Sequence, residues 1–202
     1  QYRRGKLTTH IKFDEATAIL AGNSLFSLAI ELLADKKTHH EDSVRINLIK
    51  LLADFSGING LTQGQSYDLK FEKEKPAARK IIDMYNMKTS KLFEYCLMTP
   101  FLMTKSKKSD INDALSYGKN FGLIYQITDD ILDFEGDLKK IGKTPKKDLN
   151  SNKKTLVEKI GKKKALDFCR NLAEDSTSKN NIFGSNKYIF KEMIFSLIKR
   201  TY

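Results

Sequence analysis

Cysteine is scarce in this sequence, and its scarcity argues against one class of protein. The 202 residues include two cysteines, Cys96 and Cys169, which lie far apart in the chain. A small secreted protein held together by disulfides would carry more of them, so we expect a reducing, cytoplasmic environment. The three histidines, His10, His39 and His40, make no zinc-type pattern with these cysteines. Neither a disulfide framework nor a structural zinc site is expected.

Long apolar runs are missing as well. No stretch of 18 apolar residues is present, so the sequence predicts no membrane span. The first residues, Gln1 to Lys6, are basic, and no apolar region follows them as it would in a signal peptide. The chain also lacks an initiator methionine. We therefore expect it to be a piece of a longer protein.

Alternating strand patterns, internal repeats and clear domain boundaries are absent too, whereas helical periodicity runs through nearly the whole chain. In one example, Leu25, Leu28, Ala29 and Leu32 follow the i, i+3, i+4, i+7 spacing of a helix face. A chain of this length can bury one substantial core. The sequence therefore predicts an all-α fold, a single bundle of long helices.

Caps and prolines predict where these helices begin and end. Asp14, Ser43 and Asp110 are expected N-caps. Pro76 is expected in the first turn of a helix that is interrupted at Pro100. The expected helices cover residues 13–35, 43–55, a short segment up to 71, 76–99, 110–135, 155–175 and 185–200. The segment 136–154 is expected to be a loop, and 175–186 is expected to be flexible.

The net charge is strongly positive, at +11. Such an excess indicates a polyanionic partner, although a solvated lysine-rich surface accounts for most of these side chains. Nucleic acid is not expected, because the chain has no zinc finger or aromatic-interleaved sheet motif, and its strongest acidic cluster lies within the basic half. A small diphosphate substrate would need only a few of the lysines.

The most informative pattern is a group of three aspartates at the end of an apolar run. Asp129, Asp130 and Asp133 lie at i, i+1 and i+4, so Asp129 and Asp133 project from one helix face, one turn apart. Close carboxylates repel one another, and burial increases the cost, which a bound cation would offset. Oxygen ligands without His or Cys favour Mg²⁺, which usually serves a substrate's phosphates. The alternative, an acidic helix end facing solvent, is disfavoured by the apolar neighbours.

Further polar groups stand at helix ends or on apolar helices. Gln65 and Asp68 are three residues apart and share a helix face. Lys88 and Thr89 interrupt an apolar helix, although Lys88 alone could extend to solvent. The other basic members of this set are Arg3, Arg4, Lys143 and Lys153. Each signal is weak by itself, and their combination is what carries information.

The order of these motifs resembles that of trans-type polyprenyl diphosphate synthases, of the short-chain bacterial type such as farnesyl or geranylgeranyl diphosphate synthase. The resemblance covers nearly the whole chain and rests on Arg3-Arg4-Gly5-Lys6, Glu15-Ala16-Thr17-Ala18-Ile19-Leu20-Ala21-Gly22, Gly64-Gln65-x-x-Asp68-Leu69, Lys88-Thr89, Gln126-x-x-Asp129-Asp130-x-x-Asp133-x-x-Gly136-Asp137 and Gly142-Lys143. It implies an isoprenoid synthase fold, with long helices around a central cavity, and a homodimer. Residues 1–202 would be the larger, C-terminal part of one synthase domain, with the first aspartate-rich motif upstream of Arg3.

The resemblance also implies a role for each motif residue. Asp129, Asp130 and Asp133 match the second aspartate-rich motif, which binds Mg²⁺, expected as several ions bridging to the allylic diphosphate. The residues that match catalytic groups are Asp129, Asp130, Lys88 and Arg3. The residues that match substrate-binding groups are Arg3, Arg4, Lys88, Thr89, Gln126, Lys143 and Lys153, with Lys154 as an alternative to Lys153. The basic ones would contact diphosphates, and the two neutral ones would lie near the carbocation.

The implied activity is a prenyl transfer. Isopentenyl diphosphate would condense head-to-tail with an allylic diphosphate, either dimethylallyl or geranyl diphosphate, and farnesyl diphosphate is the expected product. The family's final proton loss goes to the released diphosphate, so no side-chain base is expected. The alternatives are a geranylgeranyl diphosphate synthase, a non-catalytic subunit of a heteromeric synthase, and a basic helical nucleic-acid binder. The residues that set product length would lie upstream, so C15 and C20 products both stay open.

Overall fold

Helices make up nearly all of the structure. The computed structural model describes residues 2–3, 5–135, 154–178 and 180–200. In that part the strands are β1 (Tyr2–Arg3) and β2 (Lys6–Leu7), a short antiparallel pair that the sequence did not predict. The helices are α1 (Thr9–Lys12), α2 (Glu15–Ala34), α3 (Asp42–Ser56), α4 (Leu61–Phe71), α5 (Ala78–Tyr85), the π-helix η1 (Asn86–Ser90), α6 (Lys91–Met103), α7 (Lys108–Glu135), α10 (Leu156–Ile160), α11 (Lys162–Ser178), the 3₁₀-helix η2 (Asn180–Asn186) and α12 (Lys187–Lys199). The predicted all-α fold is confirmed.

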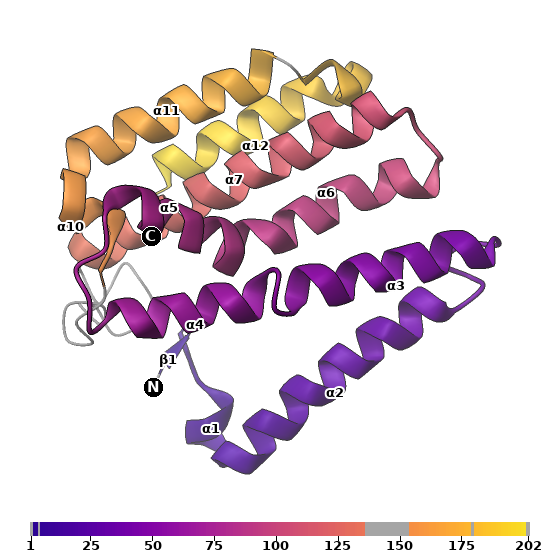
Figure 1. Cartoon of the computed structure of the whole chain (residues 1–202), viewed down its shortest axis with the longest axis horizontal. Helices are drawn as coiled ribbons and strands as arrows, with labels where there is room; N and C mark the ends of the chain where they lie inside the picture. The colour runs from indigo at the N-terminus through magenta and orange to yellow at the C-terminus, as the bar shows by residue number, and fades with distance from the viewer. Residues whose placement is uncertain (1, 4, 136–153, 179, 201–202) are drawn as a thin grey trace.

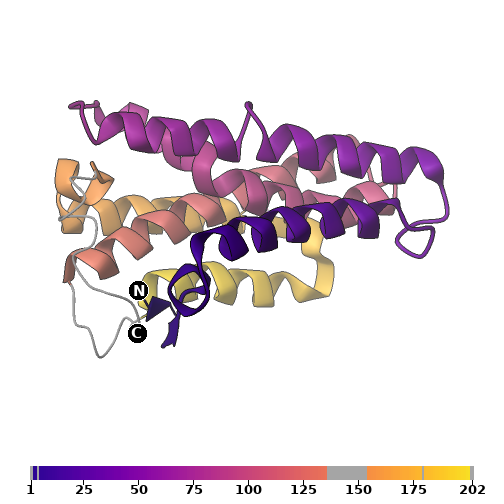
Figure 2. The ribbon, with the colours of Figure 1, turned by 90° about the horizontal axis from the view of Figure 1, so that it is seen from below.

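The helices form layers around α7. Figure 1 shows α11 and α12 on one side of α7, α6 on the other, and α3 and α4 beyond α6. Seen from below, α3 and α4 follow one another along nearly one line (Figure 2). Helix α2 lies at the outer edge of the molecule against α3. The N-terminal half therefore covers one side of a core that is centred on the C-terminal half.

The hydrophobic core joins α5, α7, α10, α11 and α12. Its most deeply buried members, all with at most 1% of their surface exposed, are Ile81, Met84, Ile124, Ile127, Leu156, Ala165, Cys169, Ala173 and Ile194. Burying side chains of the size of Ile or Leu stabilises the fold by about 1.5–3 kcal/mol each. The C-terminal end of α7 is therefore packed on several sides, and this is the end that carries the aspartates.

Two glycines bring α6 and α7 close together. A Cβ atom on Gly118 would stand 2.8 Å from the Cα of Glu94, and a Cβ on Gly122 would stand 2.5 Å from the Cα of Ser90. Real Cβ atoms do not approach this closely, so glycine is required at both positions. The two residues are four apart and share one face of α7. This close packing sets the position of the segment just before α6, which carries Lys88 and Thr89.

The single helix expected from Pro76 to Thr99 is wrong in its boundaries. Helix α5 ends at Tyr85, the π-helix η1 follows, and α6 continues through Pro100 to Met103. A proline inside a helix costs about 3 kcal/mol, and the extensive packing of α6 along α7 offsets this cost. The π-turn adds a residue within the helix, as happens frequently at functional sites.

Of the three expected N-caps, Asp14 is confirmed, whereas Ser43 and Asp110 are wrong. The carboxylate of Asp14 accepts a hydrogen bond of 2.6 Å from the backbone N–H of Thr17, so this N-cap is confirmed. Ser43 is not a cap, because α3 begins at Asp42 with Glu41 before it. Asp110 lies within α7, which begins two residues earlier. A side chain that could act as an N-cap does so only if the helix begins directly after it in the folded protein.

The stretch 175–186, expected to be flexible, is mostly helical in its described residues, with a kink at Gly184, whose φ is 52°. Helix α11 extends to Ser178, and η2 follows from Asn180. Phe183 in η2 stacks on Phe190 with 3.6 Å between ring centroids and meets Tyr117 edge-on at 5.1 Å. These aromatic contacts hold a polar stretch that has no helical pattern of its own. Most of the expected loop 136–154 lies outside the described residues.

Helix α2 is 20 residues long, and none of its residues is buried. The exposed apolar side chains on it include Ile19, Leu25, Phe26, Leu28 and Leu32. By length and composition α2 could cross a membrane, whereas the sequence analysis found no such segment. A single helix of this kind is weak evidence for a membrane span.

Candidate active site

The three predicted aspartates lie in the last two turns of α7. Asp130 and Asp133 are buried, with 5% and 4% of their surface exposed, and Asp129 is partly exposed. Their neighbours Ile127 and Ile131 are buried as well. An acidic helix end facing solvent would leave all three carboxylates exposed, so that interpretation is wrong for two of them. Buried carboxylates require partners.

Asp130 stands at the centre of a polar network. Its Oδ1 accepts a hydrogen bond of 2.9 Å from Nε2 of Gln126, and its Oδ2 accepts one from the hydroxyl of Tyr85. The Oε1 of Gln126 accepts a further bond of 2.7 Å from the hydroxyl of Thr89 in η1. The backbone N–H of Leu156, the first residue of α10, donates to the oxygen of Tyr85 at 3.0 Å. Three predicted site residues, Thr89, Gln126 and Asp130, are therefore brought together.

Tyr85 was not predicted from the sequence. It lies among apolar residues at the end of α5, where helical spacing marks it only as part of the core. Burial raises the pKa of Tyr85 well above its ordinary value, and the neighbouring charge of Asp130 raises it further. The hydroxyl is therefore protonated at neutral pH and acts as a donor to the carboxylate. No local signal distinguishes this tyrosine from a packing residue.

Lys88 does not simply extend to solvent. Its ammonium group lies 2.5 Å from Oδ2 of Asp68, and its side chain is 23% exposed. Asp68 is buried in α4, whereas Gln65, one turn earlier, is exposed. Gln65 and Asp68 were expected to share a helix face. In the structure Asp68 points into the protein, whereas Gln65 lies at its surface. The ion pair connects α4 to the π-helix that carries Thr89.

An open groove runs beside this ion pair. It has a volume of about 610 Å³ and is lined by Leu61, Thr62, Gln65, Ser66, Leu69 and Lys88. Its walls come from one face of α4 and from η1, and most of them are uncharged. Lys88 is the charged group on its wall. The groove can therefore accept an apolar chain along α4 with an anionic group at Lys88.

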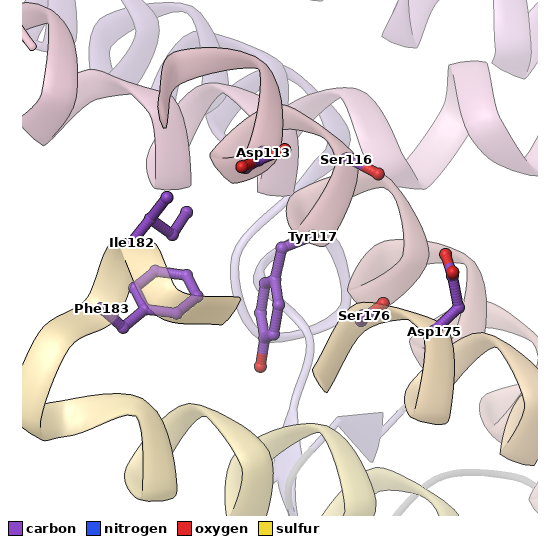
Figure 3. Close-up of a pocket in the computed structure, with 7 residues that line it drawn as sticks. All are labelled: Asp113, Ser116, Tyr117, Asp175, Ser176, Ile182 and Phe183. Carbon is purple, nitrogen blue, oxygen red and sulfur yellow. The ribbon is translucent and has the colours of Figure 1, made fainter. Parts of the chain in front are cut away.

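Further pockets lie elsewhere in the part of the chain that the structure describes. A pocket of about 190 Å³ beside α10 is lined by Lys75, Lys154 and Lys159 among others, and Lys154 lies 3.7 Å from Glu158. A third pocket, shown in Figure 3, has a volume of about 10 Å³, room for about one water molecule. The ring of Tyr117 lies between Phe183 and Ile182 on one side and Ser176 and Asp175 on the other (Figure 3). This third pocket is a packing gap between α7, α11 and η2.

The remaining predicted residues are less well placed. Arg3 is exposed in β1. Arg4, Lys143 and Lys153 lie outside the described residues. Arg200, which the sequence analysis did not include in the site, donates hydrogen bonds of 2.8 Å to the carbonyl of Tyr125 and to the hydroxyl of Thr128. The C-terminal end of the described chain therefore lies against the same part of α7 as the aspartates.

The aspartates suit Mg²⁺ in the type of ligand they offer. Carboxylate oxygens are hard donors, and Mg²⁺ is typically held by one or two of them together with waters and substrate phosphates. Within the described part of the chain, no three or more His, Cys, Asp or Glu side chains form a ready metal cage. Among the described residues, the aspartates therefore offer hard oxygen ligands of the type that Mg²⁺ takes, but do not by themselves make a closed metal site.

Comparison with known proteins finds a family match over most of the chain. Residues 1–185 match the sequence pattern of the polyprenyl synthetase family. A farnesyl diphosphate synthase of Micrococcus luteus is 39% identical over 160 residues, which are 79% of this chain and 54% of that protein. A geranylgeranyl diphosphate synthase of Cyanophora paradoxa is 32% identical over 176 residues, 87% of this chain and 59% of that protein. The chain thus spans little more than half the length of these relatives.

Solved structures share the fold. A synthase of farnesyl and geranylfarnesyl diphosphate from Zymomonas mobilis superimposes with a TM-score of 0.82 at 32% identity, over 96% of this chain and 65% of that one. A geranyltransferase of Helicobacter pylori, crystallised with magnesium and isoprenyl diphosphate, gives 0.81 at 27% identity, over 98% of this chain and 64% of that one. The family match, these relatives and the grouped site residues lead to one conclusion: the chain belongs to the polyprenyl synthetase family.

Proposed function

We propose that the protein to which this chain belongs condenses isopentenyl diphosphate head-to-tail with an allylic diphosphate, with farnesyl diphosphate as the product. The observation that carries the proposal is the pair of neighbours Lys88 and Thr89 in η1: Lys88 lies on the wall of a groove along α4, and Thr89 bonds to Gln126, which bonds to Asp130. A charged head and an apolar tail are the two parts of a prenyl diphosphate. The farnesyl diphosphate synthase relatives support this choice of substrate.

The first step is ionisation of the allylic C–O bond, which leaves a diphosphate and a carbocation. Asp129, Asp130 and Asp133 would hold Mg²⁺, which when bound supplies positive charge to the departing diphosphate. Lys88 contributes a fixed positive charge on the wall of the groove, where it binds phosphate oxygens as a point charge. Asp68, as the partner of Lys88, holds the ammonium group in place.

The second step is attack on the cation by the double bond of isopentenyl diphosphate. The hydroxyl of Thr89 and the amide of Gln126 are neutral dipoles that stabilise positive charge. Leu61 and Leu69 in the groove would contact the prenyl chain, and the cation has to be shielded from water that would quench it. The released diphosphate takes the final proton, so no side-chain base is needed. Arg3 and Arg4, with Lys143 and Lys153, would bind the two diphosphates.

The decisive experiment is an assay of the full-length protein with Mg²⁺, labelled isopentenyl diphosphate and either dimethylallyl or geranyl diphosphate. A C15 product that disappears on addition of EDTA is the expected result, and activity of the protein by itself excludes a non-catalytic subunit. A C20 product would replace farnesyl by geranylgeranyl diphosphate synthase. The absence of any prenyl product would refute the proposal. A nucleic-acid binder would instead show tight DNA affinity with a steep salt dependence.

Within this proposal, residues 1–202 are the larger, C-terminal part of a single synthase domain. The solved structures support it, since the chain covers 64–65% of two of them at nearly its full length. The first aspartate-rich motif would then lie in the preceding segment, and several Mg²⁺ ions would be shared between the two motifs. Sequencing upstream of Gln1 tests this directly.

A cytoplasmic homodimer is the corresponding proposal for assembly. Support comes from α2, which contacts α3 and carries exposed apolar side chains, with none of its residues buried. An uncovered face of this kind marks an interaction surface, and symmetric pairing of two copies is the commonest way to cover it. Light scattering of the full-length protein should give twice the monomer mass. The substitution Leu25→Glu should reduce that mass, and an unchanged dimer would exclude this face.

A further inference from the structure

Tyr85 lies where three helices meet. It is the last residue of α5, and its ring is 3% exposed. Figure 1 shows α5 and α10 beside the C-terminal end of α7. The Tyr85 hydroxyl bonds to an α7 carboxylate, that of Asp130, and to the first backbone N–H of α10, that of Leu156. A single hydroxyl group therefore connects three elements that are far apart in the sequence.

The direction of the hydroxyl proton follows from these two contacts. A tyrosine hydroxyl has one hydrogen to donate and accepts through its oxygen. Leu156 can only donate through its N–H, so it occupies the oxygen of Tyr85. The single proton of Tyr85 then points to Oδ2 of Asp130. The carboxylate receives one neutral donor on each oxygen, Tyr85 on Oδ2 and Gln126 on Oδ1.

Tyr85 and Gln126, as neutral donors on different oxygens, fix the plane of the Asp130 carboxylate. Each carboxylate oxygen has more than one acceptor position, so a hydrogen bond from Tyr85 or Gln126 does not by itself prevent that oxygen from binding a metal ion. Partners of this kind orient the groups that bind a metal, and their removal typically lowers metal affinity about 10-fold to 100-fold. Gln126 and Asp130 lie on the same helix, one turn apart, whereas Tyr85 approaches from a different helix. Tyr85 therefore supplies the tertiary restraint.

We propose that Tyr85 is a positioning residue, which orients the Asp130 carboxylate for a Mg²⁺–diphosphate complex. This inference rests on the proposed function, because it assumes that the α7 aspartates serve such a complex. Tyr85 itself does not contact the reacting atoms in this assignment. Tyr85 contributes by fixing the orientation of the Asp130 carboxylate on α7.

Tyr117 provides a matched control. It is a second tyrosine with 3% of its surface exposed, and its hydroxyl donates to the carbonyl of Phe190 at 2.5 Å. It lies beside the small pocket of Figure 3, and it precedes Asp130 by 13 residues, roughly 20 Å along α7. Tyr117→Phe therefore removes a buried tyrosine hydroxyl of equal exposure without touching the aspartates.

The test measures binding of Mg²⁺ to the full-length protein in the presence of inorganic diphosphate, by titration calorimetry. All titrations are run at a temperature at which circular dichroism shows every variant folded. Tyr85→Phe should raise the Kd for Mg²⁺ by about 10-fold or more, and Tyr117→Phe should change it less than about two-fold. Turnover of Tyr85→Phe should return close to the wild-type value at saturating Mg²⁺, which a general structural defect would not allow.

A second pair of variants isolates the contact with Asp130. On an Asp130→Asn background, Tyr85→Phe should cause little further loss of Mg²⁺ affinity, because the two groups act through one bond. A full additional loss would overturn the proposal, as would an unchanged Kd for Tyr85→Phe or an equal loss for Tyr117→Phe. Prenyl transfer by the wild type together with an unchanged Kd for Tyr85→Phe refutes the positioning role alone. No Mg²⁺–diphosphate binding by the wild type removes both proposals.

Discussion

Gly64 in α4 lies directly against the backbone of Lys88 in η1. A Cβ atom on Gly64 would stand 2.2 Å from the backbone nitrogen of Lys88 and 2.5 Å from its Cα. The two segments can pack this closely only because residue 64 has no side chain. One turn further along α4, Asp68 then reaches the ammonium group of Lys88. A helix contact made by a glycine therefore positions a charge pair on the wall of the groove.

The first prediction concerns this contact. Gly64→Ala should destabilise the protein by about 1–3 kcal/mol, because the added methyl group meets backbone atoms that cannot move aside. Urea unfolding followed by circular dichroism measures the change. Ser66→Ala, an exposed position on the same helix, is the control and should stay within about 0.5 kcal/mol of the wild type. An unchanged midpoint for Gly64→Ala would show that α4 and η1 are further apart.

The second prediction removes the charge of Lys88. Hydrogen bonds to charged groups contribute about 1.5–3 kcal/mol, so Lys88→Gln should lower kcat/KM for the allylic diphosphate by about 10-fold to 150-fold. Steady-state kinetics at fixed ionic strength measures it. Lys80→Gln, at an exposed position in α5, is a control with the same change of charge. Equal losses in both variants would mean that only the overall charge matters.

The third prediction concerns Asp129, the partly exposed aspartate of the three. Loss of a group that only hydrogen-bonds to a metal ligand typically lowers metal affinity or activity about 10-fold to 100-fold. Asp129 is proposed to be a ligand itself, so Asp129→Ala should lower turnover by at least about 100-fold. Its melting temperature should stay close to that of the wild type, because the side chain is not fully buried. Asp113→Ala, also on α7 but exposed, is the control. Near-normal turnover of Asp129→Ala would contradict the metal role.

The fourth prediction concerns the dipoles proposed to face the carbocation. Thr89→Val keeps the shape of the side chain and removes the hydroxyl that donates to Gln126. We expect kcat to fall about 10-fold, while the KM for both substrates changes little, because a cation forms only after binding. Thr99→Val is the matched control, since the Thr99 hydroxyl is also half-buried and bonds only to the carbonyl of Tyr95. A change in KM alone would assign Thr89 to substrate binding.

The fifth prediction concerns pH. Burial raises the pKa of the Cys169 thiol from 9.0 to about 12. The folded state therefore holds this proton more tightly than the unfolded state does. The resulting stability is complete below about pH 9 and is lost as the pH rises toward 12. Cys169→Ala should reduce the slope of the unfolding free energy against pH in this range. Equal slopes in both proteins would show that the thiol is not buried.

The sequence predicted those parts of the site that depend on near neighbours. The spacing of Asp129, Asp130 and Asp133 already implies their shared helix end, because an α-helix repeats every 3.6 residues. The cap at Asp14 involves a residue three positions away, and it too was predictable. Thr89 and Gln126, by contrast, were assigned to one site only through the family resemblance. Their hydrogen bond joins residues 37 positions apart.

The order of residues along this chain determined that it is helical, where most helices lie and which carboxylates stand together, because these features depend on side chains within one or two turns. Only the folded molecule decided that Tyr85 meets Asp130, 45 positions away, and Leu156, 71 positions away. It also inserted the π-turn and continued α6 through Pro100. Such contacts depend on how whole helix faces pack against one another, and no local pattern specifies that packing.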